Sequence, residues 1–407
     1  VSTWTPGKKV EPLSGPFSPN LAAVAVVPDG KLVAVGGSDQ TLRIVAKDEK
    51  NSRRLLGHIT SIRSLAAGGS RLASLGFDNA IKVWSASTIL APEFVPTNAP
   101  IVGLALDAQE RILASANADG AIAFWDPANG KKIGGVKAAG PVAAIAFSSK
   151  EASLTLAAAV GNDVAVWEVT LEKDGVKTKE LPGLKKHTEA ITCLSFSKDS
   201  PNMLASGSRD KSVIVWDVTK ADATKILKHP ETPRSLLFST ALLFTGDDVG
   251  VVRAFNPGSG NLVLPPFKVH FAAVTGLGEI SGNQNLVIVI SASADQTVRI
   301  WGTDLKAQQY GAFQVYHAHH QPVTALAQGK GFFVSGAADG AVKTWDPTLP
   351  DERFTYSKHT GPVRALLVGK NNDFVISGGA DGDIVFHRGV PRPMIGPANQ
   401  AAGDDEE

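Results

Sequence analysis

The sequence predicts an all-β protein in which repeated four-stranded units close into a single ring, a β-propeller. Three observations predict it. A pattern of alternating apolar residues returns about every forty to fifty residues along the chain. Segments with apolar residues at helical spacing are nearly absent. Hydrophobic residues make up 43% and charged residues 19%, with 40 glycines and 24 prolines, which indicates a buried, turn-rich globular protein and excludes disorder for most of its length.

Each unit contains four short segments with the character of strands. In the fifth unit they are AITCLSFS, NMLASGS, SVIVWDV and TKILKH, which alternate apolar and polar residues between turn-forming ones. Nine such units tile the chain almost end to end. Their third strands close at Val45, Trp84, Trp125, Trp167, Trp216, Phe255, Trp301, Trp345 and His387. Four-stranded units at this period are typical of propeller blades, so we predict nine blades.

Several units carry residue pairs that are typical of a known family. A Trp-Asp pair closes three third strands, and one Gly-His pair, Gly57-His58, precedes a first strand. In these residues the chain resembles the WD-repeat family over nearly its whole length. The resemblance implies that a His before the first strand, a Ser or Thr on the second, the turn Asp and the third-strand Trp form a hydrogen-bonded chain. Such a chain satisfies a buried carboxylate and a buried indole together.

Four units match all four positions of this hydrogen-bonded set. The sets are His58, Ser74, Asp78 and Trp84; His187, Ser206, Asp210 and Trp216; His270, Ser291, Asp295 and Trp301; and His319, Ser335, Asp339 and Trp345. The ninth unit departs by placing His387 where Trp belongs, and the third lacks the His. Units one, four and six keep only parts of the set, so we predict looser blades there.

The two ends of the ring must pair with each other. The ninth unit ends at its third strand, and the segment around Lys9 to Leu13 has the character of a lone strand. We predict that residues 1–20 complete the last blade, which removes two exposed strand edges. Residues 21–390 then form the propeller and residues 391–407 a flexible acidic tail. Because nine exceeds the usual four to eight blades, the alternative is eight blades with unit one or four as an appendage.

Residues that resemble catalytic or metal-binding groups have structural interpretations. The turn aspartates Asp39, Asp78, Asp119, Asp210, Asp295, Asp339 and Asp381 recur at one fixed place in the repeat, where each serves its own turn. The cluster His317, His319 and His320 lacks a nearby Cys, and a closed zinc site needs four converging ligands. The single cysteine, Cys193, lies in an apolar run and cannot form an internal disulfide. We therefore predict no enzymatic activity, no cofactor and no metal.

Charge and hydropathy restrict the kind of partner. Forty basic residues stand against thirty-nine acidic ones, without the basic excess typical of proteins that contact nucleic acid. No apolar run is long enough to cross a bilayer. We predict a cytoplasmic scaffold that binds other proteins, without membrane insertion or a small-molecule substrate. The alternatives are a component of a ribonucleoprotein complex and a propeller enzyme with a metal in its channel.

Five residues are candidates for contacting a protein partner. Arg63, Arg234 and Arg364 share one place, two residues before a first-strand Leu, and Phe77 and Arg209 directly precede turn aspartates. The resemblance implies that both places lie near one rim of the central channel. Arg and aromatic side chains are enriched in binding hot spots, and the arginines suit an acidic partner segment. The alternative is that they are ordinary solvated loop residues.

Overall fold

The chain is described by a computed structural model. The described residues are 2–3, 11–12, 21–26, 32–37, 41–46, 53–56, 62–68, 71–76, 81–85, 94–97 and 99–388, the last range with gaps at 129, 149–153, 174, 240–241, 283–285, 350–351, 358, 371 and 373. Every regular element in these ranges is a β-strand. None of these residues belongs to a helix long and apolar enough to span a membrane.

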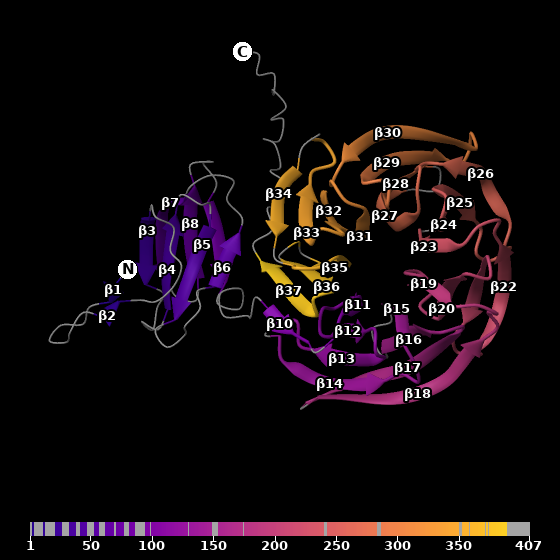
Figure 1. Ribbon diagram of the computed structural model, residues 1–407, viewed down its shortest axis with the longest axis horizontal. Coiled ribbons are helices and arrows are strands. Elements are labelled where there is room, and N and C mark those ends of the chain that lie inside the picture. Colours follow the sequence, from indigo (N-terminus) through magenta and orange to yellow (C-terminus); the bar gives the residue numbers. More distant parts are fainter. Residues whose placement is uncertain are drawn as a thin grey trace, which may run out of the picture.

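Seven four-stranded sheets form the blades of a closed ring (Figure 1). Blade 1 contains β11 (Ile101–Leu106), β12 (Leu113–Asn117), β13 (Ala121–Trp125) and β14 (Lys132–Lys137). Blade 2 contains β15 (Val142–Phe147), β16 (Leu154–Val160), β17 (Asp163–Glu172) and β18 (Gly175–Lys185). Blade 3 contains β19 (Ile191–Phe196), β20 (Met203–Ser208), β21 (Ser212–Asp217) and β22 (Asp222–Lys228).

The second half of the ring repeats the arrangement. Blade 4 contains β23 (Pro233–Phe238), β24 (Leu243–Asp247), β25 (Val251–Phe255) and β26 (Leu262–Lys268). Blade 5 contains β27 (Val274–Gly282), β28 (Leu286–Ser293), β29 (Thr297–Asp304) and β30 (Gln309–His317). Blade 6 contains β31 (Val323–Gly329), β32 (Phe332–Ala337), β33 (Ala341–Trp345) and β34 (Glu352–Ser357). Blade 7 contains β35 (Val363–Val368), β36 (Phe374–Gly379), β37 (Asp383–Arg388) and β10 (Phe94–Pro96).

The ring closes through blade 7. Each first strand contacts the first strand of the next blade, and β35 returns to β11. Figure 1 shows these first strands around the centre and the fourth strands at the circumference. The outer strand of blade 7 is β10, which pairs antiparallel with β37 so that Val95 lies opposite Ile384. This pairing covers the edge that β37 would otherwise expose.

The predicted number of blades is wrong, because the ring has seven rather than nine or eight. Units one and two form two sheets outside it. One contains β3 (Leu21–Val26), β4 (Leu32–Gly37), β5 (Thr41–Ala46) and β6 (Arg53–Leu56), and the other contains β7 (Ile62–Gly68), β8 (Arg71–Gly76) and β9 (Ile81–Ser85). The repeat pattern specifies the strands within a blade. The number of blades depends instead on which strand, distant in the sequence, pairs with β10. By joining β37, β10 closes the ring after seven blades.

The predicted closing strand is wrong as well. Within the segment around Lys9 to Leu13, the structure describes β2 (Glu11–Pro12), which pairs with β1 (Ser2–Thr3). The place expected for that segment is taken by β10. The proposed tail, residues 391–407, lies outside the described residues. Units four and six, expected to be looser, form blades 2 and 4 with all four strands paired.

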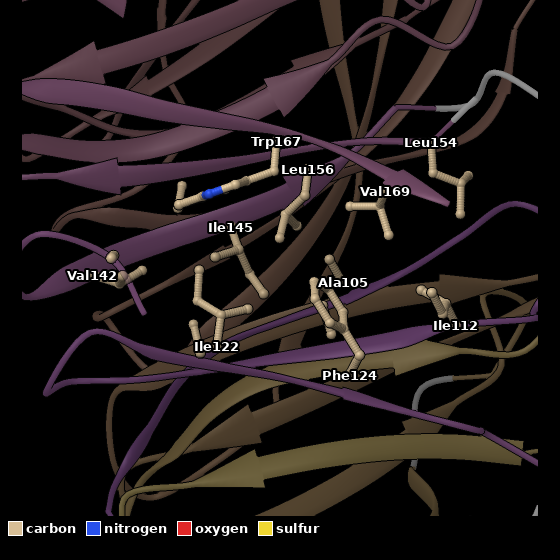
Figure 2. Close-up of a cluster of buried hydrophobic side chains, with 14 residues drawn as sticks. Ala105, Ile112, Ile122, Phe124, Val142, Ile145, Leu154, Leu156, Trp167 and Val169 are labelled. Carbon is tan, nitrogen blue, oxygen red and sulfur yellow. The ribbon is translucent and has the colours of Figure 1, made fainter. Parts of the chain in front are cut away.

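Apolar side chains between neighbouring blades make up the core. Figure 2 shows the cluster between blades 1 and 2, where Phe124, Ile145, Leu156 and Trp167 pack together. A glycine on the second strand lets the next blade approach: a Cβ at Gly378 would lie 2.6 Å from the Ile101 Cγ2. The sheets outside the ring pack on each other in the same way, with Gly36 against Ile62. They are therefore two blades stacked beside the ring.

Candidate functional site

Blades 3 and 5 contain the complete hydrogen-bonded set. In blade 3, His187 Nδ1 lies 2.7 Å from Asp210 Oδ2 and its Nε2 lies 2.8 Å from Ser206 Oγ. The Trp216 indole donates to the same hydroxyl at 2.7 Å. In blade 5 the corresponding bonds join Asp295, His270, Ser291 and Trp301 at 2.9, 2.8 and 3.0 Å. Each set joins the start of a first strand to the turn that follows the second.

Blade 7 completes the set with a different side chain. His359 Nδ1 lies 3.0 Å from both oxygens of Asp381, and its Nε2 lies 2.7 Å from Ser377 Oγ. The fourth member is His387, whose Nε2 lies 2.8 Å from the same hydroxyl. The imidazole therefore makes the contact that the indole makes elsewhere, so the ninth unit keeps the hydrogen-bonded set although His387 replaces the Trp.

Blade 6 lacks one contact that the sequence predicted. His319 and Trp345 both hydrogen bond Ser335 Oγ at 2.8 Å. However, His319 Nδ1 has no hydrogen-bond partner among the described residues, and Asp339 accepts from the Ala341 N–H instead. Burial lowers the pKa of His319 to about 4. The expected His319–Asp339 contact is therefore absent from this blade.

The set predicted for unit two falls mostly outside the described residues. Ser74 is buried on β8. His58, Asp78 and the Trp84 side chain are not described, and neither are Asp39 and Phe77.

Blade 4 lacks the hydrogen bonds of the set. Its positions hold His229, Thr245, Val249 and Phe255, and neither nitrogen of buried His229 has a hydrogen-bond partner among the described residues. A buried ion pair fixes the turn instead: Arg253 Nη1 lies 2.6 Å from Asp247 Oδ2. The other oxygen of Asp247 accepts the N–H groups of Val249 and Val251 at 3.1 and 2.8 Å. The run Gly246 to Gly250 is therefore a structural turn.

The turn carboxylates that the structure describes accept structural hydrogen bonds. Burial alone would raise the pKa of Asp210, but hydrogen bonds from Ser212, His187 and the Thr188 N–H outweigh it and hold that pKa below its usual value. The thiol of Cys193 is buried in β19, which raises its pKa to about 11. In the part of the chain that the structure describes, no three His, Cys, Asp or Glu residues gather as a metal site would require.

One edge of the ring, which we call the upper face, carries the candidate arginines. At this edge the first strands begin and the turns after the second strands lie. Hydrogen bonds join the two places: the Arg209 N–H donates to Ala190 O in blade 3, and the Asp248 N–H donates to Thr232 O in blade 4. Arg209, Arg234 and Arg364 are exposed on blades 3, 4 and 7. Arg234 pairs with Asp248. Arg63 is exposed on β7, outside the ring, so the structure does not group it with the others.

Arg234 occupies a place that is structural in other blades. The second residue of the first strand is Thr192 in blade 3 and Thr275 in blade 5, and each hydroxyl donates to a carbonyl of the next blade, Pro233 O and Val323 O. In blade 4 the following residue makes this link, from Ser235 Oγ to Val274 O at 2.8 Å. The contact between blades therefore does not need Arg234, whose side chain is left for the surface.

The upper face has a second feature, which the repeat pattern did not predict. Phe271 is 81% exposed and the Arg299 guanidinium lies over its ring, 5.4 Å from the centroid. Next to it lies the blade 4 turn, whose Gly250 carbonyl accepts from the His270 N–H, and Val249 in that turn is 41% exposed. We call Val249, Phe271 and Arg299 the Phe271 patch. A signal existed in the sequence, because Phe271 follows the first-strand His where other blades have Thr188 or Thr360.

A comparison with known families finds the repeat described as "WD domain, G-beta repeat". The matches cover more than half of the chain, at residues 7–45, 49–85, 178–217, 262–302, 312–346 and 351–387. The first two fall on the sheets outside the ring and the other four on blades 3, 5, 6 and 7. These four blades keep the His–Ser contact, whereas the first three strands of blade 4, which lacks the set, are not matched.

Several curated proteins are similar to parts of this chain. "Telomerase protein component 1" of Rattus norvegicus is 27% identical over 230 residues, which is 53% of this chain and 8% of that protein. "Transducin beta-like protein 3" of Mus musculus is 32% identical over 180 residues, 40% of this chain and 22% of that protein. An uncharacterised WD repeat-containing protein of Schizosaccharomyces pombe is 26% identical over 226 residues, 53% of this chain and 58% of that protein. The chain thus spans less than a tenth of the first relative and about a fifth of the second.

Proposed function

Since the chain belongs to the WD-repeat family, we propose that it is a non-catalytic platform that holds a protein partner on the upper face of its ring. The observation that carries this proposal is the Phe271 patch. Proteins of this family are generally scaffolds, but the fold alone does not identify a binding surface.

The Phe271 patch has the composition of a binding hot spot. Aromatic and Arg side chains dominate such spots, and here an exposed Phe ring stacks against an Arg guanidinium. A partner that covers Phe271 would bury most of an aromatic ring, worth about 2 kcal/mol of apolar transfer. Val249 extends the apolar area across the junction of blades 4 and 5.

The loop that carries Phe271 is held in place by the hydrogen-bonded set of blade 5. The Phe271 N–H donates to Asp295 Oδ2 at 3.0 Å, the same oxygen that lies 2.9 Å from His270 Nδ1. A loop fixed before binding loses less conformational entropy when a partner docks. The set therefore supports function indirectly, by presenting Phe271 on a rigid frame.

The exposed arginines of the upper face suit acidic side chains on that partner. Arg209 and Arg364 are exposed on blades 3 and 7, and Arg299 borders Phe271. Such charges raise association rates and select partners more than they add affinity. Arg234 and Arg299 contribute less charge, because Asp248 and Asp295 already pair with them. The partner we propose presents an apolar side chain flanked by carboxylates.

Membership of a larger assembly is consistent with one relative. The name "telomerase protein component 1" describes that protein as a component of telomerase, which supports a role for this chain as a subunit of a complex. Direct contact with nucleic acid is not part of the proposal, because the net charge is +1. A cytoplasmic location stays a prediction.

The test is affinity purification of the tagged full chain from its source cells, followed by quantitative mass spectrometry. The variant F271A/R299A is compared with the unchanged chain and with I226A, which removes an exposed apolar side chain of β22 at the circumference. We expect at least one partner to fall about tenfold or more with F271A/R299A and to remain with I226A. An unchanged set of partners, from variants with unchanged melting temperatures, would contradict the proposal.

A further inference from the structure

A cavity of about 450 Å³ lies at the edge of the ring opposite the upper face. Its walls are the ends of the first strands of blades 4 to 7, the turns that follow the first strands of blades 6 and 7, and Lys198 from the turn after β19 in blade 3. We call it the lower cavity. Because first strands begin at the upper face and end here, the lower cavity and the Phe271 patch are separate surfaces.

The lower cavity combines an apolar wall with positive charge. Leu237, Leu277 and Leu326 line it, and the turns after β31 and β35 add Lys330 and Lys370. Both lysines are exposed, and neither ammonium forms an ion pair within the described part of the chain. One carboxylate, that of Glu279, also lines the cavity.

The turns that carry these lysines are fixed through their backbones. Asn372, itself buried, accepts the Lys330 N–H at 2.9 Å and donates to the Lys330 carbonyl at 2.7 Å. The Glu110 carboxylate of blade 1 accepts the Lys370 N–H. Since these bonds involve main-chain atoms of the lysines, the frame does not depend on the ammonium groups. Two cations are thus presented on a preorganised edge.

We propose that the lower cavity binds an acidic segment of a partner protein, with an apolar side chain against the leucines and carboxylates on Lys330 and Lys370. The lysines favour an anionic ligand. The leucines favour an apolar group, which a phosphate backbone lacks. The chain's own acidic run, Asp404–Glu407, supplies charge but follows Ala401, Ala402 and Gly403 without a large apolar residue. An acidic segment that also carries leucine fits both halves of the lining.

The probe is a fluorescein-labelled 12-residue peptide with four Glu and two Leu among Gly and Ser, measured by fluorescence anisotropy on the full chain. A matched peptide replaces every Glu by Gln. We expect the Glu peptide to bind about tenfold or more tightly than the Gln peptide. The variant K330E/K370E should lose about tenfold or more of that affinity, and the control K225E/K228E on β22 should stay within twofold.

Four outcomes would overturn the proposal. The first is equal binding of the two peptides, and the second is unchanged peptide binding by K330E/K370E. The third is tighter binding of a ten-nucleotide single strand than of the Glu peptide. The fourth is peptide binding that appears only when Asp404, Asp405, Glu406 and Glu407 are replaced by their amides. The third outcome would assign the cavity to nucleic acid and the fourth to the chain's own acidic run. Should K330E/K370E lose its circular dichroism spectrum, K330A/K370A replaces it with the same expectation. F271A/R299A should leave peptide binding unchanged, which separates this test from that of the upper face.

Discussion

At the scale of single residues, the blades show that the hydrogen bond matters more than the side chain that makes it. Ser377 Oγ receives an imidazole contact from His387 at 2.8 Å, as Ser206 receives the Trp216 indole at 2.7 Å. The sequence pattern predicted the indole and treated His387 as a departure. The equivalence follows from chemistry, because either ring nitrogen can bond a buried hydroxyl, but a pattern that counts residue names does not reveal it.

Two histidines without an Asp partner make stability depend on pH. Burial, followed by the nearby Arg253, lowers the pKa of His229 to about 4, and burial lowers that of His319 to about 4. In the unfolded chain each histidine titrates near 6.5. As the pH falls through 6.5 the unfolded state takes up protons that the folded state refuses, so stability is lost between about pH 6.5 and 4.

We expect the free energy of unfolding in urea to fall by about 2 kcal/mol for each of these histidines between pH 7.5 and 5. His229→Gln should remove about half of that decrease, whereas the exposed His320→Gln should leave it unchanged. The partly buried turn aspartates Asp210 and Asp381 do not mimic this signal, because their lowered pKa values affect stability only below about pH 4. A pH profile that is identical in the His229 variant and the unchanged chain would contradict the assignment.

At the scale of the element, blade 4 shows how a blade survives the loss of its set. The turn Asp has become Val249 and the third-strand Trp has become Phe255. The buried pair of Asp247, the last residue of β24, and Arg253 on β25 fixes the same turn. The repeat pattern predicted a looser blade 4, because Asp247 and Arg253 fall outside the positions that define the repeat.

Breaking this pair should cost much more than breaking an exposed one. The Asp247 side chain is 1% exposed, so Arg253→Met leaves an unpaired buried carboxylate and should lower the free energy of unfolding in urea by about 3 kcal/mol or more. The matched control is Arg234→Met, which breaks the partly exposed pair with Asp248 in the same blade and should cost less than about 1 kcal/mol. Similar losses for the two variants would show that Asp247–Arg253 does not hold the turn.

At the scale of the whole molecule, the sequence predicts the strands well and the ring poorly. Alternation and turn residues are local, so the four strands of blade 3 could be read directly from the sequence. The number of blades depends on one long-range choice, whether β37 pairs with β10 or with a strand nearer the N-terminus. The two sheets outside the ring keep the repeat and the close packing at Gly36, so their sequence gives no sign that they are excluded.

In the candidate site, too, the features that recur in each repeat could be predicted and the features formed between blades could not. The hydrogen-bonded sets of blades 3 and 5 recur with the repeat and could be predicted from it. The predicted His319–Asp339 contact is absent from blade 6, and the set predicted for unit two lies mostly outside the described residues. Phe271 and the lower cavity do not recur. They arise where neighbouring blades place loop or turn residues side by side, which no single repeat encodes.

The claim on which the other claims depend is that β10 and β37 close the ring. Pairs of cysteines test this closure. The first variant, V95C/I384C, places them at positions that lie opposite each other in the structure, and the second, V10C/I384C, tests the closing segment predicted from the sequence. Cys193 does not compete, because its thiol is buried with a pKa of about 11. Under mild oxidation, mass spectrometry should find a disulfide in the first variant and none in the second. A disulfide between positions 10 and 384, with none between 95 and 384, would contradict the seven-bladed ring.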